Sequence, residues 1–350
     1  MLSYEYIFAA IIVFAILIAS AMLASILPQL TLNISDIQQL KMVAQKIMTQ
    51  LTLNPGSPPE WGSNITIGPN DLTAFGLAEY REFVRAAYIL DPDKVQRLNS
   101  RGVPSPLYMP PSRVIELFNL GHDYGLKLEF IPALNVNVNV QQSSISVSVF
   151  SEQGMPIADA NVAARVFYLQ GGQINRTSLI LNYTDIDGQC NLKFNNLSPD
   201  ALIVLLVDYN GVCVVKTRIL GSFSKSYFIG NNLILNNSLT VQNNTAYQVI
   251  AFKSGENYVI DNVSYSLTQT SSPLLSNYRV YNMTYTEPYA IALLAVTNEG
   301  ELVIACKIVP SSYSSISGEV YPPMAYTLEK SVKIGQSLYT LRLQIWRMSW

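Results

Sequence analysis

The chain has 350 residues, of which 49% are hydrophobic and only 13% charged, and its formal net charge at pH 7 is -2. A nearly neutral chain lacks the basic surface that nucleic-acid binding requires, so the composition excludes a nucleic-acid partner. The single histidine, His122, excludes most catalytic chemistry that depends on imidazole, including multi-histidine metal sites. We therefore expect a structural or binding protein of two or three domains.

A long apolar segment comes first in the chain. No charged residue occurs between Glu5 and Asp36, and residues 7–27 are apolar except for two serines. A helix rises about 1.5 Å per residue, so this segment would extend roughly 30 Å, the thickness of a bilayer core. The residues before it contain no Lys or Arg, which a signal peptide would have. We expect residues 1–28 to be a retained transmembrane anchor, with the lipid bilayer as partner of residues 7–27.

The next segment, residues 29–56, is predicted to form an amphipathic stalk helix. Ser35 followed by Gln38 indicates a capping box at its start, and the sequence Asn-Pro-Gly at residues 54–56 indicates its end. Its apolar residues recur at helical spacing, at Ile37, Leu40, Val43, Ala44, Ile47, Met48 and Leu51. We expect this face to pack on the chain's own head domain, with neighbouring subunits or the lipid surface as alternatives.

Three stretches of sequence in the first part of the chain resemble the pilin-like surface proteins of archaea. They are residues 46–62 (KIMTQLTLNPGSPPEWG), 75–78 (FGLA) and 90–94 (LDPDK), and Glu5 is similar to the acidic residue near the start of many pilin helices. In that family a hydrophobic helix continues into an amphipathic stalk under a β-rich head. The resemblance covers roughly the first 130 residues, and it implies a membrane anchor and a homo-oligomer or other envelope proteins as partners.

Residues 57–130 are predicted to be a mixed α+β segment. Short helices are expected at residues 79–89, at 92–98 with Asp91 as N-cap, and at 112–120 with Gly121 as terminator. His122 falls in a loop between two glycines, without a second metal ligand at suitable spacing. We expect it to be a structural or solvated residue.

From about residue 130 the hydrophobic period changes to two, which is typical of half-buried strands. Valines alternate with asparagines over residues 135–140, and apolar residues alternate with serines over 144–149. Further strands are expected at 163–169, 178–183, 189–194, 201–208 and 212–219, with Asn210 and Gly211 forming a tight hairpin turn. This density of short strands indicates a β-sandwich over residues 131–220.

Two motifs in this segment look like those of Ig-like and carboxypeptidase-regulatory-like (transthyretin-like) surface domains. They are residues 154–162 (GMPIADANV) and 184–188 (TDIDG), the second just before a strand. The resemblance covers about residues 143–219 and implies a non-catalytic spacer or binding module. Asp185 and Asp187 also match the start of some calcium loops, but the remaining ligands are missing. We expect a turn capped by an Asp side chain there.

Residues 221–350 are predicted to form a second β-rich domain. Strands are expected at 247–253, 258–266, 278–286, 290–297, 302–309 and 338–345. They would form a second sandwich or extend the first. The fold class is therefore mainly β, with an N-terminal transmembrane helix, an amphipathic stalk helix, a small α+β segment, and one or two β-sandwich domains.

Three cysteines offer one candidate disulfide. Cys190 and Cys213 lie on predicted strands of the same sandwich and could pair, with buried free thiols as the alternative; Cys306 has no obvious partner. The odd count and the absence of a C-x-x-C motif argue against redox or zinc chemistry.

Nine N-x-[ST] sequons occur, all C-terminal to the apolar segment. They are Asn33, Asn64, Asn175, Asn182, Asn196, Asn236, Asn243, Asn262 and Asn282. Lys41 and Lys46 after the segment give a weak signal for the opposite orientation. We follow the sequons, and expect a single-pass protein of the cell membrane with an extracellular, glycosylated C-terminal ectodomain.

These features together predict a membrane-anchored cell-surface protein with a structural or adhesive role, such as a pilin-like filament or envelope subunit. The alternative is an extracellular module that binds a glycan or peptide for a transporter or sensor, and aromatic residues converging on one concave face would favour it. An ectoenzyme with paired carboxylates is a third class. Its candidate acids, Glu60, Asp123, Asp185 and Asp187, lie in predicted loops, and no nucleophile or phosphate-binding motif is present. We expect no catalysis, cofactor or metal.

Overall fold

The structure is a computed structural model that describes residues 2–80, 87–121, 123–141, 143–194, 197–315 and 325–348. The side chains of residues 1–10, 21 and 23–36 lie outside this description. His122, Asn196 and most of the helix predicted over 79–89 therefore fall outside the described residues. Strands make up most of the regular structure of the described residues, and the α-helices among them are N-terminal, so the prediction of a mainly β protein is confirmed.

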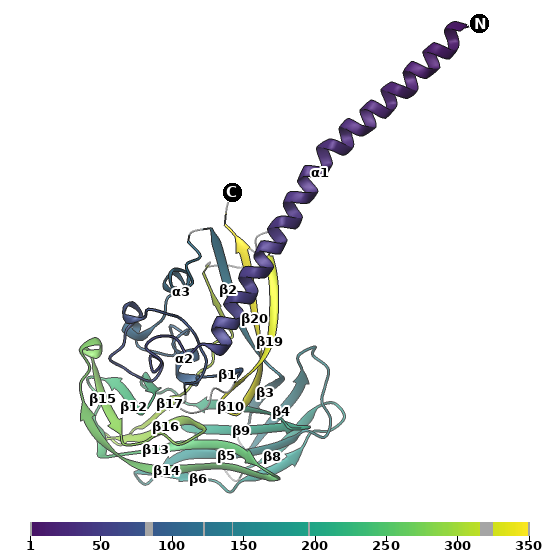
Figure 1. Cartoon of the computed structure of the whole chain (residues 1–350). Helices are drawn as coiled ribbons and strands as arrows, with labels where there is room; N and C mark the ends of the chain where they lie inside the picture. The colour runs from purple at the N-terminus through teal and green to yellow at the C-terminus, as the bar shows by residue number, and fades with distance from the viewer. Residues whose placement is uncertain are drawn as a thin grey trace.

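One helix, α1 (Leu2–Leu53), runs through both the apolar segment and the stalk. The predicted helix start at Ser35 is wrong, because the helix already continues from the N-terminal side and needs no cap there. Pro28 does not interrupt the helix either. In the C-terminal part of α1 the predicted apolar stripe is buried, as at Leu40 and Leu51, while Ile37 is exposed. Figure 1 shows the N-terminal part of α1 projecting away from the β-rich body.

The described residues contain no helix that is both long and apolar enough to span a membrane. The transmembrane segment predicted over residues 7–27 falls partly on side chains outside the description.

The remaining helices are short. α2 (Pro92–Gln96) begins as predicted, with the Asp91 carboxylate accepting hydrogen bonds from the backbone N–H groups of Asp93 and Lys94. α3 (Pro111–Leu117) confirms the third predicted helix. The described end of the 79–89 prediction is not helical, since β1 (Ile89–Leu90) is extended and Leu90 forms a bridge with Ala78. Single-turn 3-10 helices occupy Pro69–Asp71, Ser105–Leu107 and Pro273–Leu275.

Two sheets pack face to face as the predicted sandwich. The smaller sheet contains β3 (Leu134–Val140), β4 (Ser144–Ser151) and β8 (Gln189–Lys193). The larger, which we call the central sheet, contains β5 (Asn161–Gln170), β6 (Gln173–Arg176), β7 (Ile180–Tyr183), β9 (Ala201–Tyr209) and β10 (Val212–Leu220). The predicted turn between the last two strands is confirmed, with φ of 50° at Asn210 and 83° at Gly211.

A seven-stranded sheet forms the next layer. In spatial order it contains β11 (Ser226–Ile229), β12 (Asn232–Asn236), β15 (Tyr278–Met283), β14 (Asn257–Thr270), β13 (Val241–Ser254), β16 (Ala290–Thr297) and β17 (Leu302–Cys306). It curls until its edge strands β11 and β17 meet, where the Ser226 hydroxyl donates to the Ile304 carbonyl at 2.8 Å. Its concave side encloses an apolar core of its own that includes Leu233, Leu293 and Val303.

The central sheet is buried on both faces. On β9, Leu205 and Val207 face the sandwich core, whereas Val204 and Leu206 face a second core shared with the seven-stranded sheet. The uninterrupted apolar run of β9 is typical of a strand covered on both sides. The three sheets therefore form a stack of three layers (Figure 1).

The last two strands of the chain pair with strands from its N-terminal part. β19 (Ala325–Ile334) and β20 (Ser337–Arg347) join β1, β2 (Tyr124–Pro132) and β18 (Ser312–Ser314) in a fourth sheet, although the predicted domain 221–350 had grouped them with the preceding strands. The physical reason is the register of β20 along the whole of β2, which places Leu343 beside Leu128. Both join the core that covers the stalk part of α1.

We predict that Leu205→Ala lowers the free energy of unfolding by about 3 kcal/mol, because it leaves a cavity in a core where this side chain is fully buried. Urea denaturation of the full chain measures the change. Leu181→Ala is the matched control, since Leu181 is 56% exposed and its loss should cost less than about 0.5 kcal/mol. Equal effects of the two substitutions would contradict the burial of β9 against the smaller sandwich sheet.

Candidate functional site

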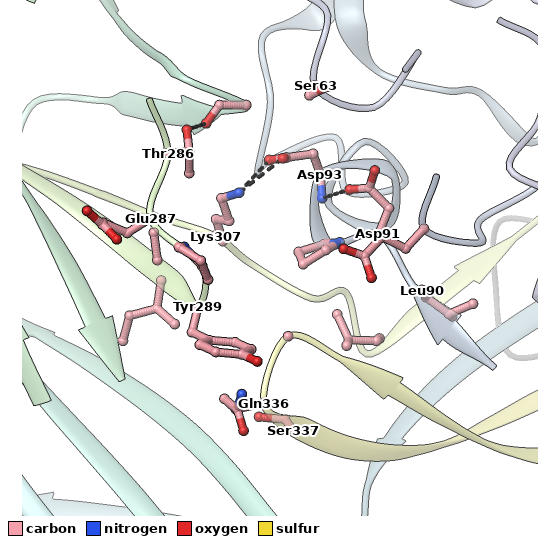
Figure 2. A pocket seen from close by; sticks show the side chains of 18 of the residues that line it. Ser63, Leu90, Asp91, Asp93, Thr286, Glu287, Tyr289, Lys307, Gln336 and Ser337 are labelled. Carbon is pink, nitrogen blue, oxygen red and sulfur yellow. Dashed lines mark hydrogen bonds and ion pairs between the residues drawn. The ribbon is translucent and has the colours of Figure 1, made fainter. Parts of the chain in front are cut away.

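A cavity of about 690 Å³ lies where three parts of the fold meet. Its walls are the chain around β1 and α2, the loop between β15 and β16, and the turn between β19 and β20, and β10 contributes Val215 and Thr217. Figure 2 shows side chains from these walls facing one another across the space. We call this cavity the junction cleft.

An ion pair joins two walls of the junction cleft. Lys307, just after β17, places its ammonium 3.0 Å from each carboxylate oxygen of Asp93 on α2 (Figure 2). The two side chains are only 12% and 10% exposed. The ammonium also lies 4.6 Å from the centre of the Phe228 ring, a favourable cation–π arrangement. The pair therefore fixes α2 against the seven-stranded sheet.

Asp91 and Lys94 lie close to Asp93 of this pair along the chain, and both already have hydrogen-bond partners within the protein. Burial raises the pKa of the Asp91 carboxyl, and the charge of Asp93 raises it further, against the opposing effects of Lys94 and Lys307. Burial lowers the pKa of Lys94, whose ammonium donates to the carbonyls of Pro55 at 2.9 Å and Ala78 at 2.8 Å. These bonds tie α2 to the end of the stalk helix.

Arg97 organises the irregular chain beside the cleft in the same way. Its guanidinium is fully buried and donates to the carbonyls of Leu107, Trp61 and Ile67. Burial lowers the pKa of Arg97 to about 10. Because a buried cation is stable only with such partners, Lys94 and Arg97 are structural residues that hold one wall of the cleft in place.

Tyrosines line the junction cleft. Tyr80, Tyr285 and Tyr289 are 48%, 53% and 42% exposed, and Tyr339 lies near the start of β20. Tyr289 has a φ of 66°, a left-handed conformation that is rare for a bulky residue. None of these residues was predicted from the sequence, although Tyr285 and Tyr289 lie close together in it, a visible signal of an aromatic surface.

The structure places the predicted sequons over all parts of the head. Asn182, Asn236 and Asn243 are exposed, whereas Asn64, Asn175, Asn262 and Asn282 are half-buried; the side chain of Asn33, and Asn196 as a whole, lie outside the described residues. The side-chain nitrogen of Asn282, which a glycan would occupy, donates to the Asn232 side chain at 3.0 Å.

The candidate disulfide between Cys190 and Cys213 is absent, and all three cysteines are free thiols. Cys190 lies in the core between the two sandwich sheets, whereas Cys213 faces the seven-stranded sheet, so the central sheet separates them. Cys213 donates to the Asp208 carboxylate at 3.2 Å, and burial raises its pKa to about 11.

The predicted Asp-capped turn is confirmed. The Asp185 carboxylate accepts hydrogen bonds from the backbone of Asp187 at 3.0 Å and Gln189 at 2.8 Å, which closes the turn before β8. Within the described part of the chain, no group of three or more His, Cys, Asp or Glu residues is arranged to hold a metal ion.

No family model matches the chain, and no curated protein matches it either. Among solved structures it is similar to the crystal structure of invasin, a bacterial integrin-binding protein, at 12% identity and a TM-score of 0.18. The match covers 63% of this chain and 54% of that chain, so the chain spans about half the length of invasin. The geometry itself defines the class of the chain, a mainly β protein with a few N-terminal helices.

We predict that Asp93 and Lys307 are energetically coupled. Asp93→Asn and Lys307→Gln should each lower the free energy of unfolding by about 2–3 kcal/mol, because each leaves a nearly buried charge without its partner. In the double variant the loss should be smaller than the sum by at least about 1 kcal/mol. Denaturation of the four proteins completes the cycle, and additive losses would show that the ion pair does not join the two walls.

Proposed function

We propose that the chain is a surface protein that the N-terminal part of α1 anchors in a membrane, with a structural or adhesive β-rich head outside. The observation that carries this proposal is the exposure of residues 11–20, which are apolar apart from Ser20. Ile11, Ile12 and Val13 are 58%, 57% and 55% exposed, and successive residues of a helix point about 100° apart, so the exposed apolar surface extends around the helix.

A helix that is apolar on every side is stable only where lipid or other helices surround it. The Ser20 hydroxyl donates to the Leu17 carbonyl at 2.9 Å, so this polar group is satisfied within the helix and needs no water. By contrast, the stalk part of α1 is apolar on one side, and that side is buried against the head. The change along one helix supports a bilayer around residues 7–27 and a water-exposed head beyond them.

The arrangement of a long helix and a β-rich head also supports a pilin-like filament or envelope subunit. In such an assembly the apolar part of α1 would pack against the same part of neighbouring copies. Electron microscopy of the cell surface with tagged protein tests this step: labelled filaments support it, and a diffuse membrane label contradicts it and leaves a single-pass anchor.

We predict that Leu17→Arg moves the full chain out of the membrane fraction. A charge at the centre of an apolar span costs about 3 kcal/mol, which corresponds to roughly a hundredfold change in partition. Fractionation of cells followed by immunoblotting measures the distribution. Gln45→Arg is the control, because Gln45 is an exposed position on the stalk part of the same helix.

Two results would reject the membrane anchor. One is a wild-type chain recovered in the soluble fraction without detergent, and the other is a Leu17→Arg variant that remains in the membrane as fully as Gln45→Arg.

The exposed sequons support an extracellular head, and they yield a further prediction. For a chain modified after folding, we expect glycans at Asn236 and Asn243, which are exposed, and none at Asn282, whose side-chain nitrogen is hydrogen-bonded. Mass spectrometry of glycopeptides from the native membrane measures the occupancy of each site. Unmodified Asn236 and Asn243 together with protease protection of the head in intact cells would place the head on the other side.

A second candidate function is an extracellular ligand-binding module. The observation that favours it is the junction cleft, whose tyrosines converge on one concave surface between parts of the fold. This function is compatible with an anchor at α1, since the cleft is built entirely from the head.

A further inference from the structure

We propose that the junction cleft binds a neutral oligosaccharide, with Tyr289 as the central stacking residue. This inference gives a ligand class to the second candidate function, and it does not depend on how α1 is anchored. Three properties of the cleft support it: its size and position, its balanced charges and its tyrosine lining.

The size and position of the cleft fit a small ligand. Its volume of about 690 Å³ lies within the range of roughly 300–1,000 Å³ that ligand pockets occupy. It lies between separately formed parts of the fold, where ligand sites commonly occur. The ion pair of Asp93 and Lys307 and the carbonyl bonds of Lys94 hold its walls together, so the space is largely formed before a ligand arrives.

Most of the charged side chains around the cleft are engaged within the protein, which favours a neutral ligand. Asp93 pairs with Lys307, and Asp91 caps α2. The carboxylate of Glu287 accepts a hydrogen bond from the Tyr265 hydroxyl. A charged ligand would have to compete with these bonds, whereas a neutral ligand with many hydroxyl groups would leave them intact.

The tyrosines offer both an apolar face and a hydroxyl group to a sugar ring. A tyrosine presents an apolar face with a hydroxyl at its edge, so it can cover the apolar side of a pyranose and hydrogen-bond its hydroxyl groups. Tyr289 stands in the middle of the cleft, opposite Gln336 and Ser337 (Figure 2). Its ring packs against that of Phe252 in a tilted arrangement, at 5.6 Å between ring centres. The left-handed backbone of Tyr289 is a strained conformation of the kind that is found at ligand-binding sites.

Strands at the cleft already use backbone groups within the fold, which disfavours an extended peptide. A peptide that adds to a sheet needs a row of open backbone groups. On β10 the backbone N–H of Val215 already donates to the Ser337 hydroxyl at 2.8 Å. β1 pairs with β19 on one side, and Leu90 pairs with Ala78 on the other. The remaining contacts are side chains and turns, which suit a sugar better than a strand.

The test uses the full chain in lipid nanodiscs, which avoids sugar-based detergents. Isothermal titration with cellotetraose, maltotetraose, mannotetraose and chitotetraose should show saturable binding of at least one of them. The key variant is Tyr289→Gly. It removes the ring, and glycine adopts a positive φ without strain, so the fold should keep its stability. We expect it to raise the Kd at least tenfold.

Tyr183→Ala is the matched control, because Tyr183 is 63% exposed on β7 and is not part of the cleft. It should leave the Kd unchanged, and Tyr289→Phe, which keeps the ring, should retain most of the binding. The proposal is overturned if none of the four sugars binds, or if Tyr289→Gly binds as well as the wild type. It is also overturned if only an acidic tetragalacturonate or a ten-residue valine- and threonine-rich peptide binds at the cleft. None of these results bears on the membrane anchor, which the Leu17→Arg variant tests separately.

Discussion

The burial of β9 on both faces is the constraint on which the rest of the head depends. A strand without a polar face must be covered twice, and here the small sandwich sheet covers one side and the seven-stranded sheet the other. Polar contacts strengthen the second interface: Asp208 at the end of β9 accepts hydrogen bonds from Lys253 at 2.6 Å and Tyr258 at 3.2 Å. Burial alone would raise the pKa of Asp208, but these bonds bring it below its usual value. The three sheets therefore act as one body, and the junction cleft is formed at its border.

A second constraint concerns the irregular chain between the stalk helix and β2. This segment has little regular structure to satisfy its backbone groups, and two buried cations take over that role. Lys94 and Arg97 together bind five carbonyl groups from separate turns. The return of β19 and β20 closes the core over the stalk part of α1. As a result, the helix that we propose as anchor and the wall of the cleft belong to the same packed unit.

The membrane anchor and the ligand site that we propose lie on surfaces of different chemistry. The exposed apolar side chains of α1 form a continuous segment on one helix, where only lipid or other helices can satisfy them. The head carries tyrosine, asparagine and hydroxyl side chains in place of charges, and four of the tyrosines line the junction cleft. Low charge thus has two physical sources in this chain, an apolar helix and a polar but uncharged head.

The sequence by itself determined the features that depend on neighbouring residues. Alternation located β3, β4 and most later strands, Asn210 and Gly211 located a hairpin, and Asp91 located the start of α2, because periodicity and capping act over a few positions. The candidate site was predictable only as a class, a concave surface with aromatic residues. Tertiary structure decided that α1 continues past Ser35, that β20 pairs with β2, that Cys190 and Cys213 face different cores, and that Tyr289 stands opposite Gln336. These outcomes depend on which distant surfaces bury one another, and local patterns carry no information about the partner.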